Sequence, residues 1–126
     1  MVRRHIGLLI GLQLIFAMPM AFCQSPAPGE ITHLLNFVEQ SGCRFKRNGR
    51  WYDSHEARLH LEQKRDYLAK RGMLPDAESF ILRAASQSSM SGQPYLVQCP
   101  NGPELPSSTW LTNELLHHRS APPSAN

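Results

Sequence analysis

Residues 43–52 constrain the fold more than any other part of the chain, because they read as a complete β-hairpin. Two short runs flank Asn48-Gly49, the dipeptide that best accepts the two positive φ angles of a type I′ turn. In the first run Cys43 and Phe45 alternate with basic residues, as in a strand with one buried face and one solvent-exposed face. The sequence therefore predicts a tight hairpin that contributes one face to the core.

The first 23 residues are typical of a cleaved secretory signal peptide. Arg3 and Arg4 precede an apolar run over residues 6–18, which is shorter than a membrane-spanning helix. Cys23 raises the alternative of a lipoprotein, but Phe22 occupies the preceding position, where a lipoprotein signal carries a small residue. We therefore expect cleavage after Cys23, a periplasmic or secreted product, and no integral membrane segment after cleavage.

Removing residues 1–23 of the 126 leaves 103, the size of one small domain with a thin core. The cut also removes Arg3 and Arg4, so the net charge falls from +3 to +1. Most of the net positive charge thus belongs to the signal peptide, and the mature chain lacks the charge expected of a nucleic-acid-binding protein.

Cleavage also leaves an even pair of cysteines, Cys43 and Cys99. In an oxidising compartment such a pair predicts a disulfide. Closing a loop of this size stabilises a fold by about 4 kcal/mol on the chain-entropy model, a large share of a small domain's stability.

The remaining pattern predicts an α+β fold with about four helices packed on a small three-stranded antiparallel sheet. Helical periodicity or capping residues indicate helices over residues 30–41, 53–71, 76–85 and 107–117, the last capped by Ser107, Ser108 or Thr109. Residues 94–99 read as a third strand beside the hairpin, and residues 100–106 as a turn-rich connection. We expect a flexible leader over residues 24–29, one domain over 30–117 and a flexible tail over 118–126.

The hairpin also carries the most concentrated charge of the chain. Arg44, Lys46, Arg50 and Trp51 form a candidate surface for an anionic group or an acidic partner, with the indole supplying stacking area. The alternative is a solvated hairpin face, on which cations discourage strand-to-strand aggregation.

Recognisable catalytic motifs are missing. The serine-rich residues 88–92 lack the spacing of a nucleophile elbow or a phosphate loop. The histidines after residue 23 include no i, i+4 pair for zinc, and a disulfide would consume both thiols. We assign no catalytic residue, metal site or cofactor, and expect binding rather than catalysis.

The spacing of residues over most of the mature domain resembles the YfeK-like family of small exported bacterial proteins, whose function is unknown. The motif positions are Phe45, Arg47, Asn48, Gly49, Tyr52, Glu56, Ala57, His60, Leu61, Lys64, Ala77, Glu78, Phe80, Ile81, Ser88, Ser89, Ser91, Gly92, Pro94, Tyr95 and Val97. The resemblance implies no catalytic residues.

Several polar motif positions share a helical face, since Glu56, His60 and Lys64 follow one another at i, i+4. We hypothesise that they form a polar network with Arg47 beside the turn that contains Ser89 and Ser91. The alternative is a hydrogen-bond network that only fixes the fold.

The sequence thus favours an interaction module that binds a protein or another component of the cell envelope. One rival is a small envelope hydrolase that uses a Glu, His or Ser of the network. Another is an inhibitor or immunity-type protein, in which the basic hairpin would meet an acidic cleft.

Overall fold

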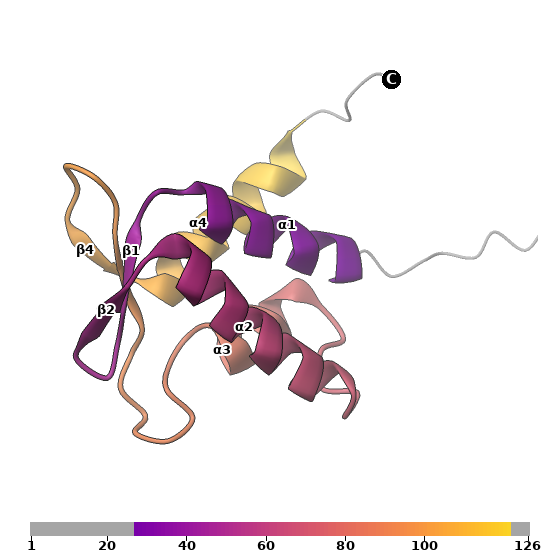
Figure 1. The fold of residues 1–126 in the computed structure, drawn as a ribbon. Coiled ribbons are helices and arrows are strands. Elements are labelled where there is room, and N and C mark those ends of the chain that lie inside the picture. Colours follow the sequence, from indigo (N-terminus) through magenta and orange to yellow (C-terminus); the bar gives the residue numbers. More distant parts are fainter. Residues whose placement is uncertain (1–26, 122–126) are drawn as a thin grey trace, which may run out of the picture.

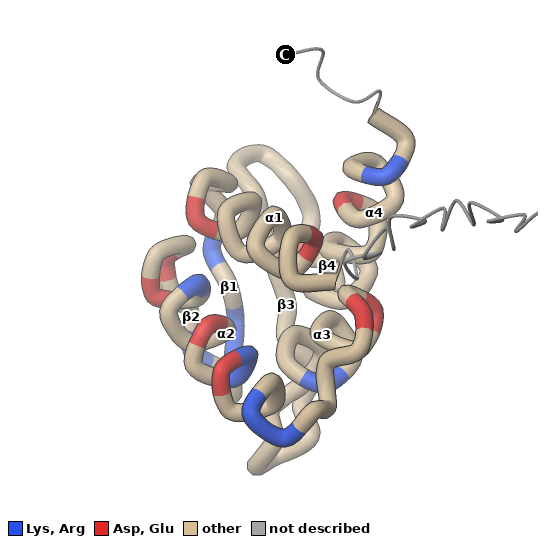
Figure 2. Tube along the Cα trace, turned by 90° about the vertical axis from the view of Figure 1, so that its right-hand side faces the viewer, with Lys and Arg blue, Asp and Glu red and all other residues tan. Residues whose placement is uncertain are grey.

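The computed structural model describes residues 27–121, which form four helices and one antiparallel sheet of four strands. The helices gather to one side of the sheet (Figure 1), and Figure 2 shows α1 and α2 in front of the strands. In chain order the elements are α1 (Ala27–Gln40), β1 (Arg44–Arg47), β2 (Arg50–Tyr52), α2 (Ser54–Ala69), α3 (Ala77–Ala84), β3 (Leu96–Gln98), β4 (Glu104–Pro106) and α4 (Ser107–Ser120).

The predicted hairpin is confirmed. β1 and β2 pair antiparallel with Phe45 opposite Tyr52 and Arg47 opposite Arg50. Between them Asn48 has φ 51° and Gly49 has φ 79°, the two positive angles that a type I′ turn requires. The turn therefore fixes the register, and with it which side chains of the hairpin face the helices.

The prediction of three strands is wrong by one. The sheet runs in the order β2-β1-β3-β4, and β4 pairs with β3 through Leu96 opposite Pro106 and Gln98 opposite Glu104. Residues 100–106 read as a connection because β4 is short and ends in a proline, which cannot donate to a ladder. At the edge of a sheet that loss is tolerated, since one side of the strand has no partner.

The core lies between the four helices and the inner face of the sheet. Phe80 of α3, Leu34 and Leu35 of α1 and Leu111 of α4 have almost no exposed surface. Val97 contributes the buried centre of β3. Because α1 packs against the other three helices, it holds the helical layer together.

The start of α2 agrees with the sequence prediction, whereas the start of α4 does not. Asp53 caps α2 by accepting a 2.8 Å hydrogen bond from the backbone N–H of Glu56. The residue before α4 is Pro106, which supplies no side-chain cap, so the cap predicted at residues 107–109 is wrong. Ser107 is instead buried, and its N–H donates to the carbonyl of Tyr95 at 2.9 Å.

Two helices are longer than the sequence indicates. α1 begins at Ala27 rather than at residue 30, because Pro28 fits the first helical turn, where no backbone donor is lost. α4 continues to Ser120, past the predicted domain end at residue 117. Its last turn is held by Arg119, which donates to the carboxylates of Glu30 and Glu78. Parts of the predicted leader and tail therefore belong to the folded domain.

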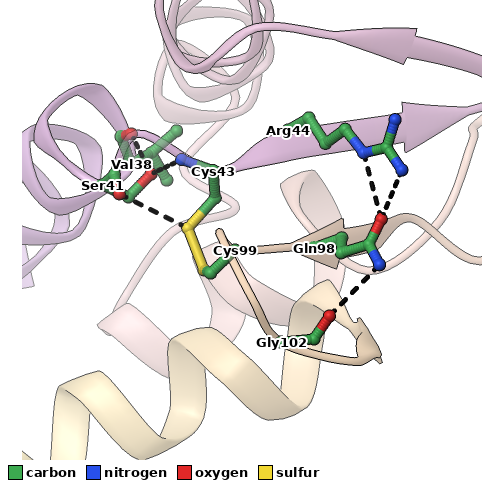
Figure 3. The surroundings of a disulfide bond; sticks show 7 residues. All are labelled: Val38, Ser41, Cys43, Arg44, Gln98, Cys99 and Gly102. Carbon is green, nitrogen blue, oxygen red and sulfur yellow. Dashed lines mark hydrogen bonds between the residues drawn. A yellow bond between two sulfur atoms is a disulfide. The ribbon is translucent and has the colours of Figure 1, made fainter.

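The predicted disulfide between Cys43 and Cys99 is present, with the two Cα atoms 4.1 Å apart. It joins the residue before β1 to the residue after β3, and these strands are hydrogen-bonded neighbours. Figure 3 shows that Arg44 and Gln98 extend the link, since the guanidinium donates to the amide oxygen at 3.0 Å from Nε. The bridge therefore secures the centre of the sheet.

The predicted signal peptide, the first leader residues and the end of the predicted tail lie outside the described residues. Within residues 27–121, no helix has both the length and the apolar character needed to cross a bilayer.

Candidate functional site

The inner face of the hairpin meets α2 in a cluster of polar side chains. Arg47 of β1 lies against His60 of α2, with Nη1 2.6 Å from Nδ1 and 2.9 Å from Nε2. Its Nη2 donates to the hydroxyl of Tyr52 at 3.3 Å, and its guanidinium lies 4.9 Å from the centre of that ring. The turn geometry makes this possible, because it places Arg47 and Tyr52 on the side of the sheet that faces α2.

Tyr95 and Lys64 complete the cluster. The Tyr95 hydroxyl lies 3.2 Å from Nε2 of His60 and accepts a hydrogen bond from Nζ of Lys64 at 3.3 Å. Lys64 also donates to the carbonyl of Gln87 at 3.3 Å. The backbone holds Tyr95 in place, since its N–H donates to the carbonyl of Ser86 at 2.9 Å.

His60 is surrounded by hydrogen-bond donors. The guanidinium of Arg47 can only donate, and its Nη1 lies within hydrogen-bond distance of both ring nitrogens, so one of these nitrogens accepts from it. Burial, followed by the charges of Arg47 and Lys64, lowers the pKa of His60 to about 4. His60 is therefore an uncharged imidazole near neutral pH.

The neighbouring groups are also perturbed. Burial and then the charge of Arg47 lower the pKa of the Lys64 ammonium. The hydrogen bond from Arg47 lowers the pKa of Tyr52, whereas burial raises the pKa of Tyr95. Burial is thus the first cause of the pKa shifts of Lys64 and Tyr95, whereas the hydrogen bond from Arg47 is the first cause for Tyr52.

The cluster lies at a cavity of about 370 Å³ between the hairpin and α2. Phe45, Ala57, Leu59 and Leu61 give it apolar walls. Its polar groups come from the residues just described and their neighbours: Lys46, Arg47, Tyr52, Glu56, His60, Gln63, Tyr95 and Ser107. An apolar cavity with a few convergent polar groups is the usual form of a small-molecule site.

Three of the six residues predicted for the network come together: Arg47, His60 and Lys64. Glu56 lines the same cavity, but its carboxylate makes no hydrogen bond or ion pair with these three side chains. Ser89 is exposed and lies on a separate hollow of about 220 Å³, which His60 and Lys64 also line.

Ser91 belongs to a different set of contacts, at the tip of the hairpin. Its hydroxyl donates to the side-chain oxygen of Asn48 at 2.5 Å. The buried hydroxyl of Ser88 accepts from the side-chain nitrogen of Asn48 and from two N–H groups of its own loop. The serine-rich loop thus braces the turn and does not enter the cavity.

The predicted basic surface is divided between the two faces of the sheet. Arg44 and Lys46 lie over the ring of Trp51, at 4.2 and 5.3 Å from its centre. Arg50 is paired with Arg47, and residues directly opposite in an antiparallel pair share a face. Arg50 therefore lies on the helix side near Tyr52, 5.8 Å from that ring, away from the other three.

Sequence reasoning did not assign the two tyrosines to the site. Both occupy positions of the family motif, and a signal for Tyr52 was available, because a two-residue turn places it opposite the inward-facing Phe45. Nothing local signals Tyr95, which reaches His60 through the pairing of β3 with β1.

Two features of catalytic sites are missing from residues 27–121. No serine hydroxyl contacts His60 in residues 27–121, so the imidazole has no nucleophile to activate in the described structure. In the same part of the chain no group of three or more His, Cys, Asp or Glu side chains is placed to hold a metal ion.

The fold and the bridge define a small disulfide-linked α+β domain with a polar cluster beside a cavity. Comparison with protein families identifies it further: the family of unknown function DUF5329 matches residues 25–119, and the chain belongs to that family. Neither the curated proteins nor the solved structures contain a significant match.

Proposed function

We propose that this protein is a small exported binding module, and that the cavity between the hairpin and α2 holds a component of the cell envelope or part of a protein partner. The observation that carries the proposal is the set of Arg47, His60 and two tyrosines at the edge of an apolar cavity. Polar groups arranged beside apolar walls give a ligand both affinity and orientation.

Export is the second part of the proposal. It is supported by the basic start and apolar run within residues 1–23, and by the disulfide, which is typical of oxidising compartments. The resemblance to the YfeK-like family points the same way. Intact-mass measurement of protein from the periplasm should show a chain that starts after Cys23, and a full-length or lipidated mass would contradict this.

Binding is favoured over the hydrolase alternative because His60 is enclosed by donors and contacts no serine. The inhibitor alternative depends on the outer face of the hairpin, where Arg44 and Lys46 stack on Trp51. The cavity beside α2 differs from that face in combining apolar walls with convergent hydrogen-bond donors.

Blocking the cavity tests the proposal. Leu59 is 44% exposed and lines the cavity, so Leu59→Trp places a larger ring there without disturbing buried residues. Leu82 of α3, which is 69% exposed and does not line the cavity, gives the matched control Leu82→Trp. Immobilised protein should retain an envelope component that Leu59→Trp loses and Leu82→Trp keeps. Equal retention by all three proteins would refute the cavity as the binding site.

A further inference from the structure

We infer that the ligand group bound in the cavity is an organic monoanion: a carboxylate held by Arg47 and the hydroxyls of Tyr52 and Tyr95, attached to an apolar body. This inference rests on the proposed function, since it names the chemical class that the same cavity takes. It depends on three features of the site, which are an unneutralised cation, unused donor capacity and apolar walls.

Arg47 is partly buried and has only neutral partners, whereas Arg44, Arg50 and Arg71, which also lack a carboxylate partner, are exposed. Its guanidinium contacts the imidazole of His60 and the hydroxyl of Tyr52, and no carboxylate lies within ion-pair distance in residues 27–121. In contrast, Arg58, Arg65 and Arg119 each pair with one or more carboxylates. A partly buried guanidinium without a counterion is costly to desolvate, and a carboxylate matches its two-pronged geometry.

The two phenols have protons left to donate. The oxygen of Tyr95 accepts from Nζ of Lys64, and its hydroxyl can rotate to direct its own proton from Nε2 of His60 to another acceptor. The oxygen of Tyr52 accepts from Arg47, which leaves its proton free as well. With Arg47 these groups form a set of donors at one edge of the cavity, and the acceptor that suits them is an anionic oxygen.

The charge balance favours a single negative charge. Among the residues that line the cavity, Lys46 and Arg47 carry one positive charge each and Glu56 carries one negative charge. The net charge of +1 balances a carboxylate, whereas a phosphate dianion would exceed it.

The remaining walls define the body of the ligand. Phe45, Ala57, Leu59 and Leu61 present carbon to the cavity, and the rings of the two tyrosines stand beside the donors. A cavity of about 370 Å³ suits a body the size of an aromatic ring with a short chain. Apolar surface of this kind adds affinity in proportion to the area it buries.

The test compares 3-phenylpropionate with its uncharged amide and with inorganic phosphate. Each is titrated into the purified protein while NMR signals of the His60 ring and of residues 45–61 are followed. We expect saturable shifts with the carboxylate, and binding at least about tenfold weaker for the amide, because a charge-assisted hydrogen bond contributes more than a neutral one. Phosphate should bind more weakly than the carboxylate.

Arg47→Gln should weaken 3-phenylpropionate binding by about tenfold or more, as expected on losing a charged hydrogen bond. The matched control is Arg44→Gln, which removes the same charge from the outer face, where Arg44 is bonded to Gln98; it should leave the binding unchanged. Well-dispersed amide spectra check that both variants are folded.

The outcomes distinguish a wrong ligand class from a wrong binding site. Equal binding of the carboxylate and the amide, or stronger binding of phosphate, would overturn the monoanion while leaving the cavity as a binding site. The monoanion is also overturned if no probe binds while Leu59→Trp still abolishes capture of an envelope component. If no probe binds and Leu59→Trp changes nothing, the proposed function fails together with its ligand class.

Discussion

Acid should destabilise this protein through His60, because the folded state resists protonation of that ring. The unfolded pKa is 6.5, while burial and two neighbouring cations lower the folded pKa to about 4. As pH falls through this window the unfolded chain binds a proton first, so stability present above about pH 6.5 is lost toward pH 4. Between about pH 7.5 and pH 4.5 the full linkage amounts to about 2.5 kcal/mol. Solvent screening of the half-buried ring reduces our expectation to about 1–2 kcal/mol.

Urea unfolding at the two pH values, followed by tryptophan fluorescence, measures this loss. His60→Gln should remove the part of the stability loss that comes from protonation of the imidazole. The loss that comes from the carboxylates of the domain occurs in both proteins, so it cancels when the variant is compared with wild type. His55→Gln on the same helix is the matched control. The hydrogen bond to Glu39 raises the pKa of His55. The contribution of His55 to folding stability is therefore lost as pH rises rather than as pH falls. A His60 pKa near 6.5 by NMR, or an equal acid loss in wild type and His60→Gln, would refute the reasoning.

Three other perturbations follow from the scaffold. Replacing both Cys43 and Cys99 by Ser should lower the free energy of unfolding by about 4 kcal/mol, given a sequence separation of 56; a loss under about 1 kcal/mol in chemical denaturation would contradict the assigned role. Gly49→Ala should cost about 1 kcal/mol from backbone strain alone, because no atom lies within 4 Å of the added Cβ, and a neutral melting temperature would argue against the type I′ turn. Charge reversal at Arg44 should change stability by less than about 1 kcal/mol through its contact with Trp51 and leave 3-phenylpropionate binding intact, whereas lost binding would move the site to the outer face.

The parts of the fold that sequence predicts well are those determined by local chemistry. The Asn48-Gly49 turn depends on backbone preferences of two residues, and the cap of α2 depends on Asp53 and the N–H three positions later. The disulfide could be predicted from the even number of cysteines left after cleavage and from the oxidising compartment expected for an exported protein. β4 has no such local signal, because its three residues gain strand geometry only by pairing with β3.

The candidate site shows the same division. Arg47 was predicted from its position in the family motif, and His60 and Lys64 from the motif together with the i, i+4 step along a helix. Glu56 satisfies the same step, yet its carboxylate makes no hydrogen bond or ion pair with these three side chains. Arg50 was assigned to the wrong group because the basic residues were grouped by charge, whereas the hairpin register pairs it with Arg47.

The contact of Arg119 with Glu30 has a consequence for how this domain can be attached to its surroundings. It holds the first turn of α1 beside the last turn of α4, with Nε 2.6 Å from the carboxylate. Both ends of the domain are thus on one side, while the hairpin lies at the other (Figure 1). An anchor, a fusion partner or a solid support joined at either terminus leaves the cavity facing outward, so the domain can be tethered without covering its site.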